Sequence, residues 1–480
     1  MRAAPRACTA AGVGADFRPV SADLISLSAR DAVAALRAGA VAPRELVEAA
    51  LRRIEECDGP LNALPTVCAE RALARADAVT GQLALAGLPI AVKDLDDVAG
   101  VRTTYGSPIY ADHVPARSDI MVERLEERGA IVVAKSNTPE FGAGANTFNE
   151  VFGATRNPWD TSRTCGGSSG GSAVALATRQ VWLATGSDLG GSLRTPASFC
   201  SVVGLRPSPG RVARSADRPF DTLSVEGPMA RDVADCALLL DAMAGPHPED
   251  PLALPAPSGS FLAAGLAPAL PARIAWSDDL GVTPVEREVL DVCRAAVARL
   301  AAAGVEVAEA QPELATAPDV FHALRAAGYV AGLGPEYETN RDRLKPEIVW
   351  NVELGLAQPP ERVGWAERER GRMIHETAAF LRGHGFLACP AACVLPFPVE
   401  QRWVEEVEGV RFDNYVEALR ITSALTLTGC PVIAIPCGFT QAGLPVGIQL
   451  AAQHQGEAAL LRAAAAIEAV LDVARREPPP

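Results

Sequence analysis

The sequence predicts an α/β fold in which a β-sheet is layered between helices. Short apolar runs alternate along the chain with longer segments of helical periodicity, a pattern typical of such folds. The chain has 480 residues, of which 49% are apolar, so it can bury a large core. Charged residues make up only 21% of the chain, which argues against disorder.

The first predicted elements are two helices within residues 29–57. Pro43 suits the first turn of the second helix, and the apolar residues from Leu46 to Ile54 recur at helical spacing. This face is expected to pack on the rest of the protein.

From residue 87 onward, predicted strands and helices alternate. The apolar run 88–92 predicts a strand that ends directly before Lys93 and Asp94. A helix is predicted over 118–128, with Ser118 as its N-cap. Further strands are predicted at 131–134, 181–185, 274–276, 305–308, 432–435 and 446–450. Further helices are predicted at 231–243, 285–302, 363–381, 413–424 and 457–472.

Two proline-rich stretches, 207–219 and 245–260, are predicted to be linkers or surface loops. The segment 310–420 is harder to divide into strands, yet it holds 11 of the 24 aromatic residues. Either a pocket-forming subregion or a satellite hydrophobic core would explain this enrichment.

Composition excludes several classes of function. The chain has 44 basic and 58 acidic residues, a net charge of −14 and no basic run, so we expect no nucleic-acid partner. No apolar stretch is long enough to span a membrane, and the N-terminus lacks the apolar core of a signal peptide, so a cytoplasmic protein is expected. The eleven cysteines contain no C-x-x-C pair, and therefore we expect reduced thiols, no metal and no cofactor.

Lysine is rare in this chain. Lys93, Lys135 and Lys345 are the only lysines beside 41 arginines. Arginine stays protonated in proteins, whereas lysine can become a neutral base, so each lysine is a candidate for chemistry. Lys93 stands at a predicted strand end, while Lys135 is expected to be structural and Lys345 to be a surface charge.

The glycine- and serine-rich segment 166–172 has three functional interpretations. A phosphate-binding loop would need a lysine followed by Ser or Thr, but Ser172 and Ala173 stand there. Residues 166–170 also spell G-x-S-x-G, the nucleophile elbow of α/β-hydrolases, which requires a buried strand before it. The preceding residues 157–165 are polar and contain proline, so an esterase of that type is the weaker alternative.

The third interpretation adds a second cluster, Asp188-Leu-Gly-Gly-Ser192, which follows a predicted strand. Consecutive glycines allow backbone N–H groups to converge on one point, as in an oxyanion pocket. Two serine clusters, a lysine at a strand end and no suitably placed histidine indicate a serine nucleophile activated by lysine.

With these motifs the sequence resembles the amidase signature family. The matching text is Gly-Gly-Ser-Ser-Gly-Gly-Ser at 166–172 and Asp-Leu-Gly-Gly-Ser at 188–192, with further matches at 87–94, 129–141, 157–160, 196–207, 428–431 and 443–449. The resemblance covers about residues 30–470 and is weakest from 310 to 420. It implies a mixed, twisted central β-sheet covered by α-helices on both faces.

The resemblance also implies how the chain is organised. Residues 1–75 would be an N-terminal helical arm packed on the core, and residues 76–472 a single domain. Within that domain 310–420 would be a variable substrate-pocket subregion, and residues 473–480 would be a frayed tail.

The resemblance assigns a role to each member of a Ser-Ser-Lys triad. Ser192 is the implied nucleophile, Ser168 the relay and neutral Lys93 the base, with a cis peptide between Gly167 and Ser168. The implied oxyanion hole is formed by the backbone N–H groups of Leu189, Gly190, Gly191 and Ser192.

Neighbouring residues are expected to support this site. Asp188 would hold the glycine loop through backbone hydrogen bonds, and Arg194 would pair with a nearby carboxylate. Ser169 is expected to form hydrogen bonds around the site. Cys165 lacks a partner base and is not expected to react.

The implied activity is hydrolysis of a small-molecule amide, ester or carbamate (urethane) through an acyl-enzyme. The aromatic-rich segment favours an aryl or otherwise apolar substrate, and the enzyme would be a monomer or homodimer. The alternative within the same family is a catalytic subunit of a tRNA-dependent amidotransferase, which would require partner subunits.

Overall fold

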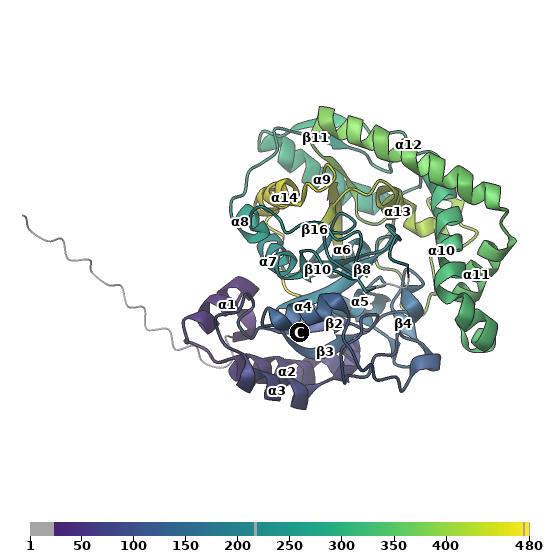
Figure 1. The fold of residues 1–480 in the computed structure, drawn as a ribbon. Coiled ribbons are helices and arrows are strands. Elements are labelled where there is room, and N and C mark those ends of the chain that lie inside the picture. Colours follow the sequence, from purple (N-terminus) through teal and green to yellow (C-terminus); the bar gives the residue numbers. More distant parts are fainter. Residues whose placement is uncertain (1–23, 216–217, 474–475, 480) are drawn as a thin grey trace, which may run out of the picture.

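The computed structural model describes residues 24–215, 218–473 and 476–479 (Figure 1). Within these ranges the chain forms one sheet of eleven strands with α-helices on both faces, so the predicted α/β class is confirmed. The sheet order is β1 (Thr66–Val67), β3 (Ile131–Ser136), β2 (Pro89–Lys93), β8 (Leu183–Asp188), β10 (Val225–Ala230), β9 (Val203–Arg206), β16 (Val432–Phe439), β17 (Pro445–Ala451), β13 (Leu387–Pro390), β11 (Arg273–Trp276) and β12 (Glu306–Glu309).

The sheet is mixed. Strand β2 runs parallel to β3 and β8, and β11 runs parallel to β12 and β13, whereas the pairs from β8 to β13 across the centre are antiparallel. Two-stranded ribbons lie outside it: β4 (Phe148–Asn149) with β5 (Gly153–Ala154), β6 (Arg156–Asn157) with β7 (Asp160–Thr164), and β14 (Glu406–Val407) with β15 (Val410–Arg411).

The α-helices of the described residues pack around this sheet. They are α1 (Ala29–Arg37), α2 (Pro43–Leu61), α3 (Ala69–Ala78), α4 (Ile120–Glu127), α5 (Gly170–Ala177), α6 (Arg194–Cys200), α7 (Val233–Met243), α8 (Phe261–Gly265), α9 (Arg287–Ala302), α10 (Ala317–Asn340), α11 (Pro346–Ala357), α12 (Pro360–His384), α13 (Arg420–Leu427) and α14 (Glu457–Leu471).

Two hydrophobic cores occupy the two faces of the sheet. Along β2, Ile90 and Val92 belong to the core shared with α4 and α7, whereas Ala91 belongs to the core shared with α2 and α5. In β8, likewise, Leu183 belongs to the first of these cores and Ala184 to the second. Because successive strand residues point to opposite faces, every apolar position of these strands is buried, which explains their continuous apolar runs.

The boundaries of several predicted helices differ from the structure by a few residues. Helix α4 begins at Ile120 with Asp119 as its N-cap, because the Ser118 hydroxyl instead accepts a hydrogen bond from Ala99 N–H (2.9 Å). The helix predicted at 413–424 is a short 3-10 turn, Glu417–Leu419, followed by α13.

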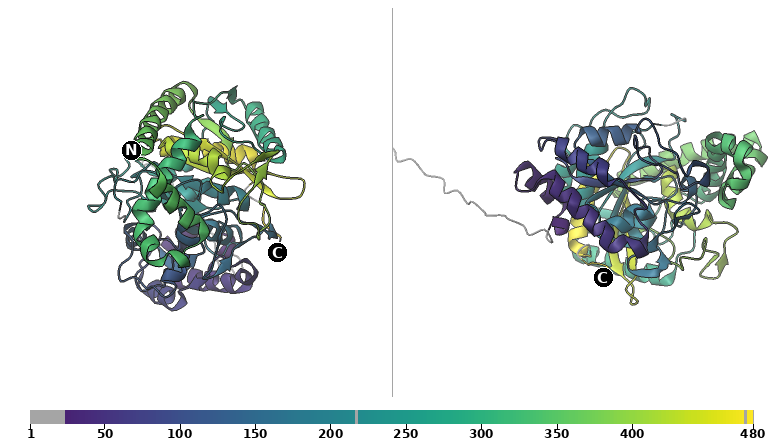
Figure 2. Two further views of the ribbon diagram at one scale, coloured as in Figure 1. Left: turned by 90° about the vertical axis from the view of Figure 1, so that its right-hand side faces the viewer. Right: turned by 90° about the horizontal axis from the view of Figure 1, so that it is seen from below.

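Helices α10, α11 and α12 stand to one side of the sheet, as Figures 1 and 2 show in green. Helix α10 contacts α11, α12 and α13. A small satellite core is centred on Tyr329 of α10 with Ile348 and Val352 of α11. This region therefore contributes packing of its own as well as surfaces toward the site.

The chain ends are only partly covered. Of the N-terminal arm predicted over 1–75, residues 1–23 lie outside the described residues, as do 474, 475 and 480 of the predicted tail. In the described part of that tail, Glu477 forms an ion pair with Arg179 (2.5 Å), and the Arg476 guanidinium lies 4.2 Å from the centre of the Phe439 ring.

Candidate active site

The site forms where β2 and β8 end. These strands run parallel, with Ile90 opposite Leu183, so their carboxyl ends meet at one edge of the sheet. Lys93 is the last residue of β2, and its backbone N–H donates to Thr185 Oγ1 of β8 (3.1 Å). The lysine amine thus lies at the end of a strand, and segments distant in the sequence surround it.

The Lys93 amine is fully buried among hydroxyl groups. Its Nζ lies 2.7 Å from Ser168 Oγ and 2.9 Å from both Ser169 Oγ and Ser187 Oγ. Burial lowers the pKa of Lys93 to about 8, although the carboxylates of Glu226, Asp96 and Asp188 act to raise it. A neutral amine suits this environment, because it has two N–H donors and one lone pair, and hydroxyls can both donate and accept.

The two Gly/Ser segments come together at this amine. Ser168 and Ser169 lie just before α5, and the peptide between Gly167 and Ser168 is cis, as the resemblance implied. Ser192 lies just before α6, and its carbonyl accepts a hydrogen bond from Ser169 N–H (3.1 Å). Ser168 and Ser192 line the same cavity, and no hydrogen bond joins their hydroxyls among the described residues.

Asp188 holds the glycine loop that follows β8. Its carboxylate accepts from the backbone N–H groups of Gly191 (3.0 Å) and Leu193 (3.2 Å), and it binds the Arg194 guanidinium through both oxygens (2.9 and 3.0 Å). Burial alone would raise the pKa of Asp188, but Arg194 holds it well below its usual range. Both predicted contacts, Asp188 to the backbone and Arg194 to a carboxylate, are confirmed.

The glycine loop fits tightly against α13. Gly191 has a φ of +120°, and a Cβ atom there would lie 2.4 Å from Thr422 Oγ1, so only glycine fits. Because the Gly191 N–H already donates to Asp188, it is less available than predicted for an oxyanion. No described side chain accepts from the backbone N–H groups of Leu189, Gly190 and Ser192, which remain the candidate oxyanion donors.

We expect Asp188→Asn to weaken both the fold and the site. The substitution leaves the buried Arg194 guanidinium without its counter-charge, and breaking a buried pair destabilises by about 3–5 kcal/mol. Denaturant unfolding would measure the loss of stability, and kcat of the folded variant is expected to fall as the glycine loop loosens. The control Asp278→Asn removes the partner of exposed Arg294 and should change stability by under about 1 kcal/mol. Equal stability of the two variants would contradict this role for Asp188.

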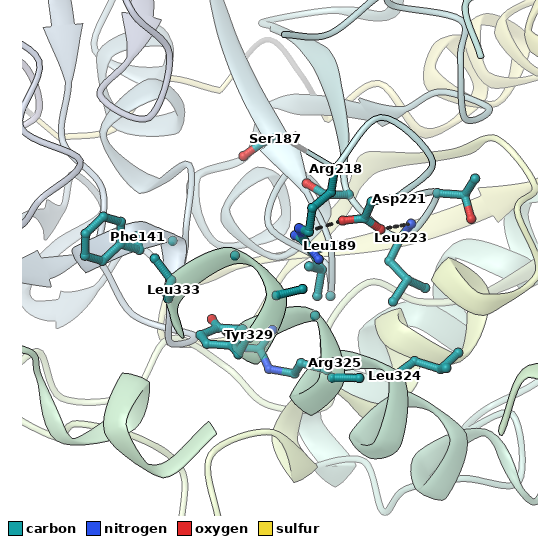
Figure 3. Close-up of a pocket in the computed structure, with 18 of the residues that line it drawn as sticks. Phe141, Ser187, Leu189, Arg218, Asp221, Leu223, Leu324, Arg325, Tyr329 and Leu333 are labelled. Atoms are coloured by element: carbon teal, nitrogen blue, oxygen red, sulfur yellow. Dashed lines mark hydrogen bonds and ion pairs between the residues drawn. The ribbon is translucent and has the colours of Figure 1, made fainter. Parts of the chain in front are cut away.

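Ser168 and Ser192 are among the residues that line a cavity of about 680 Å³. Figure 3 shows other residues of its wall, among them Phe141 and Arg218. Its walls come from the loop after β2, from residues 141–144, from the glycine loop, from residues 214–224 and from helices α10 and α12. The stretch 207–219, predicted to be a linker or surface loop, therefore contributes Arg214, Arg218 and Pro219 to the cavity. Sequence reasoning missed these residues because no local motif marks them.

Two aromatic residues of the cavity wall have left-handed backbone conformations. Tyr105 has a φ of 52° and Phe141 a φ of 46°, values that bulky residues seldom adopt. Their rings stack at 6.2 Å, and the Tyr105 hydroxyl donates to Asp97 (2.7 Å). Unfavourable backbone of this kind persists where the surrounding structure holds it, often at binding sites.

The predictions for the other two lysines, Lys135 and Lys345, compare differently with the structure. Lys135 is buried and pairs with Asp94 (3.1 Å), a contact that fits the structural role predicted for it. The prediction that Lys345 is a surface charge is wrong. Its side chain is buried, its Nζ donates to the Ala143 carbonyl (2.7 Å), and burial lowers its pKa to about 8. The Lys345 side chain is buried because the start of α11 packs against residues 140–148. No local sequence pattern indicates this packing.

Alternative chemistries find little support in the geometry. Cys165 is fully buried, and burial raises the pKa of its thiol to about 12, which disfavours the reactive thiolate. The strand before Ser168, β7, pairs with β6 and forms a bridge to Pro398, both outside the central sheet, so it is not the buried central strand that a nucleophile elbow requires.

Two further observations concern metal-ligating side chains and long apolar helices in the part of the chain that the structure describes. There, no group of three or more His, Cys, Asp or Glu side chains is placed so that it could hold a metal ion. None of the helices within those ranges is long and apolar enough to cross a membrane.

Comparison with known proteins adds independent information. The model of a family described as Amidase matches residues 45–461. An acylamidase of Rhodococcus erythropolis is 33% identical over 466 residues, which cover 94% of this chain and 97% of that protein. A glutamyl-tRNA(Gln) amidotransferase subunit of Anaeromyxobacter dehalogenans (strain 2CP-C) is 36% identical over 499 residues, covering 95% of this chain and 99% of the relative.

Solved structures share the same fold. The structure of 6-aminohexanoate cyclic dimer hydrolase complexed with substrate superposes with a TM-score of 0.86. The two chains are 25% identical, and the match covers 95% of this chain and 99% of the other.

Proposed function

The chain belongs to the amidase signature family and is an amide-hydrolysing enzyme, and we propose that it cleaves the C–N bond through an acyl-enzyme formed on Ser192. The observation that carries this proposal is the buried Lys93 amine, which lies 2.7 Å from the Oγ of Ser168, a serine that lines the same cavity as Ser192. These residues together supply a nucleophile, a proton relay and a base.

In the first step, Ser192 Oγ attacks the substrate carbonyl. Its proton passes to Ser168, whose own proton passes to the lone pair of neutral Lys93. Ser168 suits the relay because the neighbouring Ser169 hydroxyl already donates to the Ser187 carbonyl (3.4 Å) and accepts from the lysine.

The attack converts the carbonyl oxygen into an oxyanion. The backbone N–H groups of Leu189, Gly190 and Ser192 are the proposed donors to it, held in place by the contacts of Asp188. The proton then returns from Lys93 through Ser168 to the leaving nitrogen, and the C–N bond breaks. Water attacks the resulting acyl-enzyme by the same route and releases the acid.

The buried lysine makes the activity dependent on pH. Because its pKa is about 8, acidification below that value protonates the amine and removes the base. We expect kcat/KM to rise with pH through about 8 and to level off above it, falling about tenfold per pH unit on the acid side. A rate profile with a substrate that does not ionise would measure this, with circular dichroism to exclude unfolding. A flat profile between about pH 6 and 9 would contradict a titrating base.

The cavity supports an aryl or otherwise apolar substrate. Leu95, Phe141, Leu324, Leu333 and Val363 are among its apolar wall residues, and the stacked Tyr105 and Phe141 offer a surface for a ring. Amides are the first proposed substrates. Esters and carbamates (urethanes) are also proposed, because they present a similar carbonyl to the same serine. The region within 310–420 that contains α10 and α12 is proposed to set this preference.

A hydrolysis screen tests the proposal. Aryl and alkyl anilides, carbamates and primary amides would be offered to the purified chain alone, beside its Ser192→Ala variant. Turnover of anilides by the single chain, lost in the variant, would support the proposal. A chain that hydrolyses none of them and is not labelled at Ser192 by a fluorophosphonate would overturn it.

The second candidate is a subunit of a tRNA-dependent amidotransferase, which the 36% identity to such a protein favours. Glutamine-dependent activity that appears only with co-purified partners would support it. A stand-alone enzyme, as monomer or homodimer in the cytoplasm, remains the first proposal, and chromatography with cell fractionation would check both points.

A further inference from the structure

Arg325 of α10 is a buried cation in the wall of the cavity, beside Tyr329 (Figure 3). Its side chain is held by neutral groups. Nε donates to Asn351 Oδ1 (3.2 Å), and Nη2 donates to the hydroxyls of Tyr329 (2.8 Å) and Tyr415 (2.5 Å). These contacts set the plane of the guanidinium without neutralising its charge.

The remaining nitrogen of this guanidinium is unused. No described group accepts a hydrogen bond from Nη1, and Arg325 is one of the residues that line the cavity. No described carboxylate lies within ion-pair distance of Arg325, whereas Arg218 and Arg214 of the same cavity pair with Asp221 (3.0 Å) and Glu226 (3.5 Å). Arg325 therefore differs from Arg214 and Arg218 in that no described carboxylate pairs with its charge.

Three aromatic rings lie close to the guanidinium. The rings of Tyr329, Tyr415 and Phe321 have their centres 4.6, 5.5 and 5.9 Å from Arg325 Cζ. They stabilise a cation in part, but buried charges are usually paired. A rigid, partly desolvated guanidinium with free N–H donors is the group that binds a carboxylate most strongly.

This cation lies close to the glycine loop. A Cβ atom on Gly190 would lie 3.1 Å from Phe321 Cζ, and the same ring contacts Arg325 on α10. The Phe321 ring thus lies between Arg325 and the glycine loop, so a substrate group bound to Arg325 would be near the proposed oxyanion donors.

We propose that Arg325 binds a carboxylate of the substrate, so that the enzyme prefers amides that carry an anionic group on a chain or ring that spans from Ser192 to α10. This inference rests on the proposed function and adds a substrate class to it. The carboxylate would accept a hydrogen bond from Nη1 and would supply the counter-charge that no described carboxylate provides.

Matched substrates test the preference. Mono-anilides of straight-chain dicarboxylic acids, which carry the carboxylate on the acyl side of the amide, would be compared with their methyl esters. Acetanilides that carry a carboxylate on the ring would be compared with the corresponding methyl esters, which tests the amine side. For a chain of suitable length, we expect the wild type to favour the acid by about tenfold or more in kcat/KM. In Arg325→Gln this ratio should fall to about one, because the acid loses more of its kcat/KM than the ester does.

Two control variants separate the role of Arg325 from other effects. Arg341→Gln removes an exposed charge that pairs with Glu353 outside the cavity, and it should leave the ratio unchanged. Arg370→Gln removes the other cavity arginine that lacks an ion pair among the described residues. Equal losses for acid and ester in Arg325→Gln would indicate a structural role and overturn the proposal, as would loss of the preference in Arg370→Gln alone.

Binding can be measured without turnover. Calorimetric titration of the acid and ester anilides into Ser192→Ala, and into the double variant with Arg325→Gln, would report the carboxylate contact directly. Tighter binding of the acid that depends on Arg325 would support the inference even if Ser192 proved not to be the nucleophile. Equal affinities for acid and ester in Ser192→Ala would overturn it while leaving amide hydrolysis intact.

Discussion

Replacement of Ser192 by alanine is expected to lower amide hydrolysis by about 10⁴-fold or more, because no acyl-enzyme can form without its hydroxyl. Ser168 lies nearest to Lys93 but cannot substitute for Ser192, since its hydroxyl is needed as the relay and is directed to the amine. The residual rate should come from the oxyanion donors alone. KM is expected to change little, because the cavity walls remain.

Two measurements test this expectation. Intact-mass analysis after a fluorophosphonate should show one added group in the wild type and none in Ser192→Ala. Ser172→Ala is the matched control, because Ser172 stands in the same Gly/Ser text but its hydroxyl binds Ser136 and the Thr185 carbonyl instead of facing the cavity. This control should still be labelled once its melting temperature shows that it folds. Labelling of Ser192→Ala at another serine would contradict the assigned nucleophile.

The sequence indicated which segments would meet at the candidate site because each of them is a short local motif. The strand ending at Lys93 and the two Gly/Ser segments each occupy a few consecutive residues, and the positive φ of Gly191 explains why glycine stands there. Their family resemblance also indicated the cis peptide before Ser168. The sheet was predictable for the same reason, since its strands are continuous apolar runs.

The walls of the cavity were not predictable in this way. Arg218 and Arg325 are separated by more than a hundred residues from each other, and only tertiary packing brings them together at the glycine loop. Lys345 illustrates the same limit, because its burial depends on contacts with residues 140–148 that no periodicity encodes. Composition showed aromatic enrichment in 310–420, but it could not show that Tyr329 and Tyr415 would orient an arginine.

The lysine at the strand end leads to the second large effect. We expect Lys93→Arg to lose hydrolysis nearly as completely as Lys93→Ala, by about 10³-fold or more. A guanidinium remains protonated at any pH at which the protein is folded, so it cannot accept the proton that Ser168 passes on. Its larger planar head must also fit where Nζ now contacts three serine hydroxyls within 2.9 Å.

The pH response distinguishes lost basicity from poor fit. Wild-type activity should rise through about pH 8, whereas the residual activity of Lys93→Arg should show no such rise. Lys135→Arg is the matched control: that lysine is equally buried but pairs with Asp94, so its role needs a positive charge and not a free base. If it folds, it should keep much more activity than Lys93→Arg. Substantial turnover by Lys93→Arg, with a wild-type pH profile, would rule out a neutral lysine as the base, because no proton acceptor would then remain at that position.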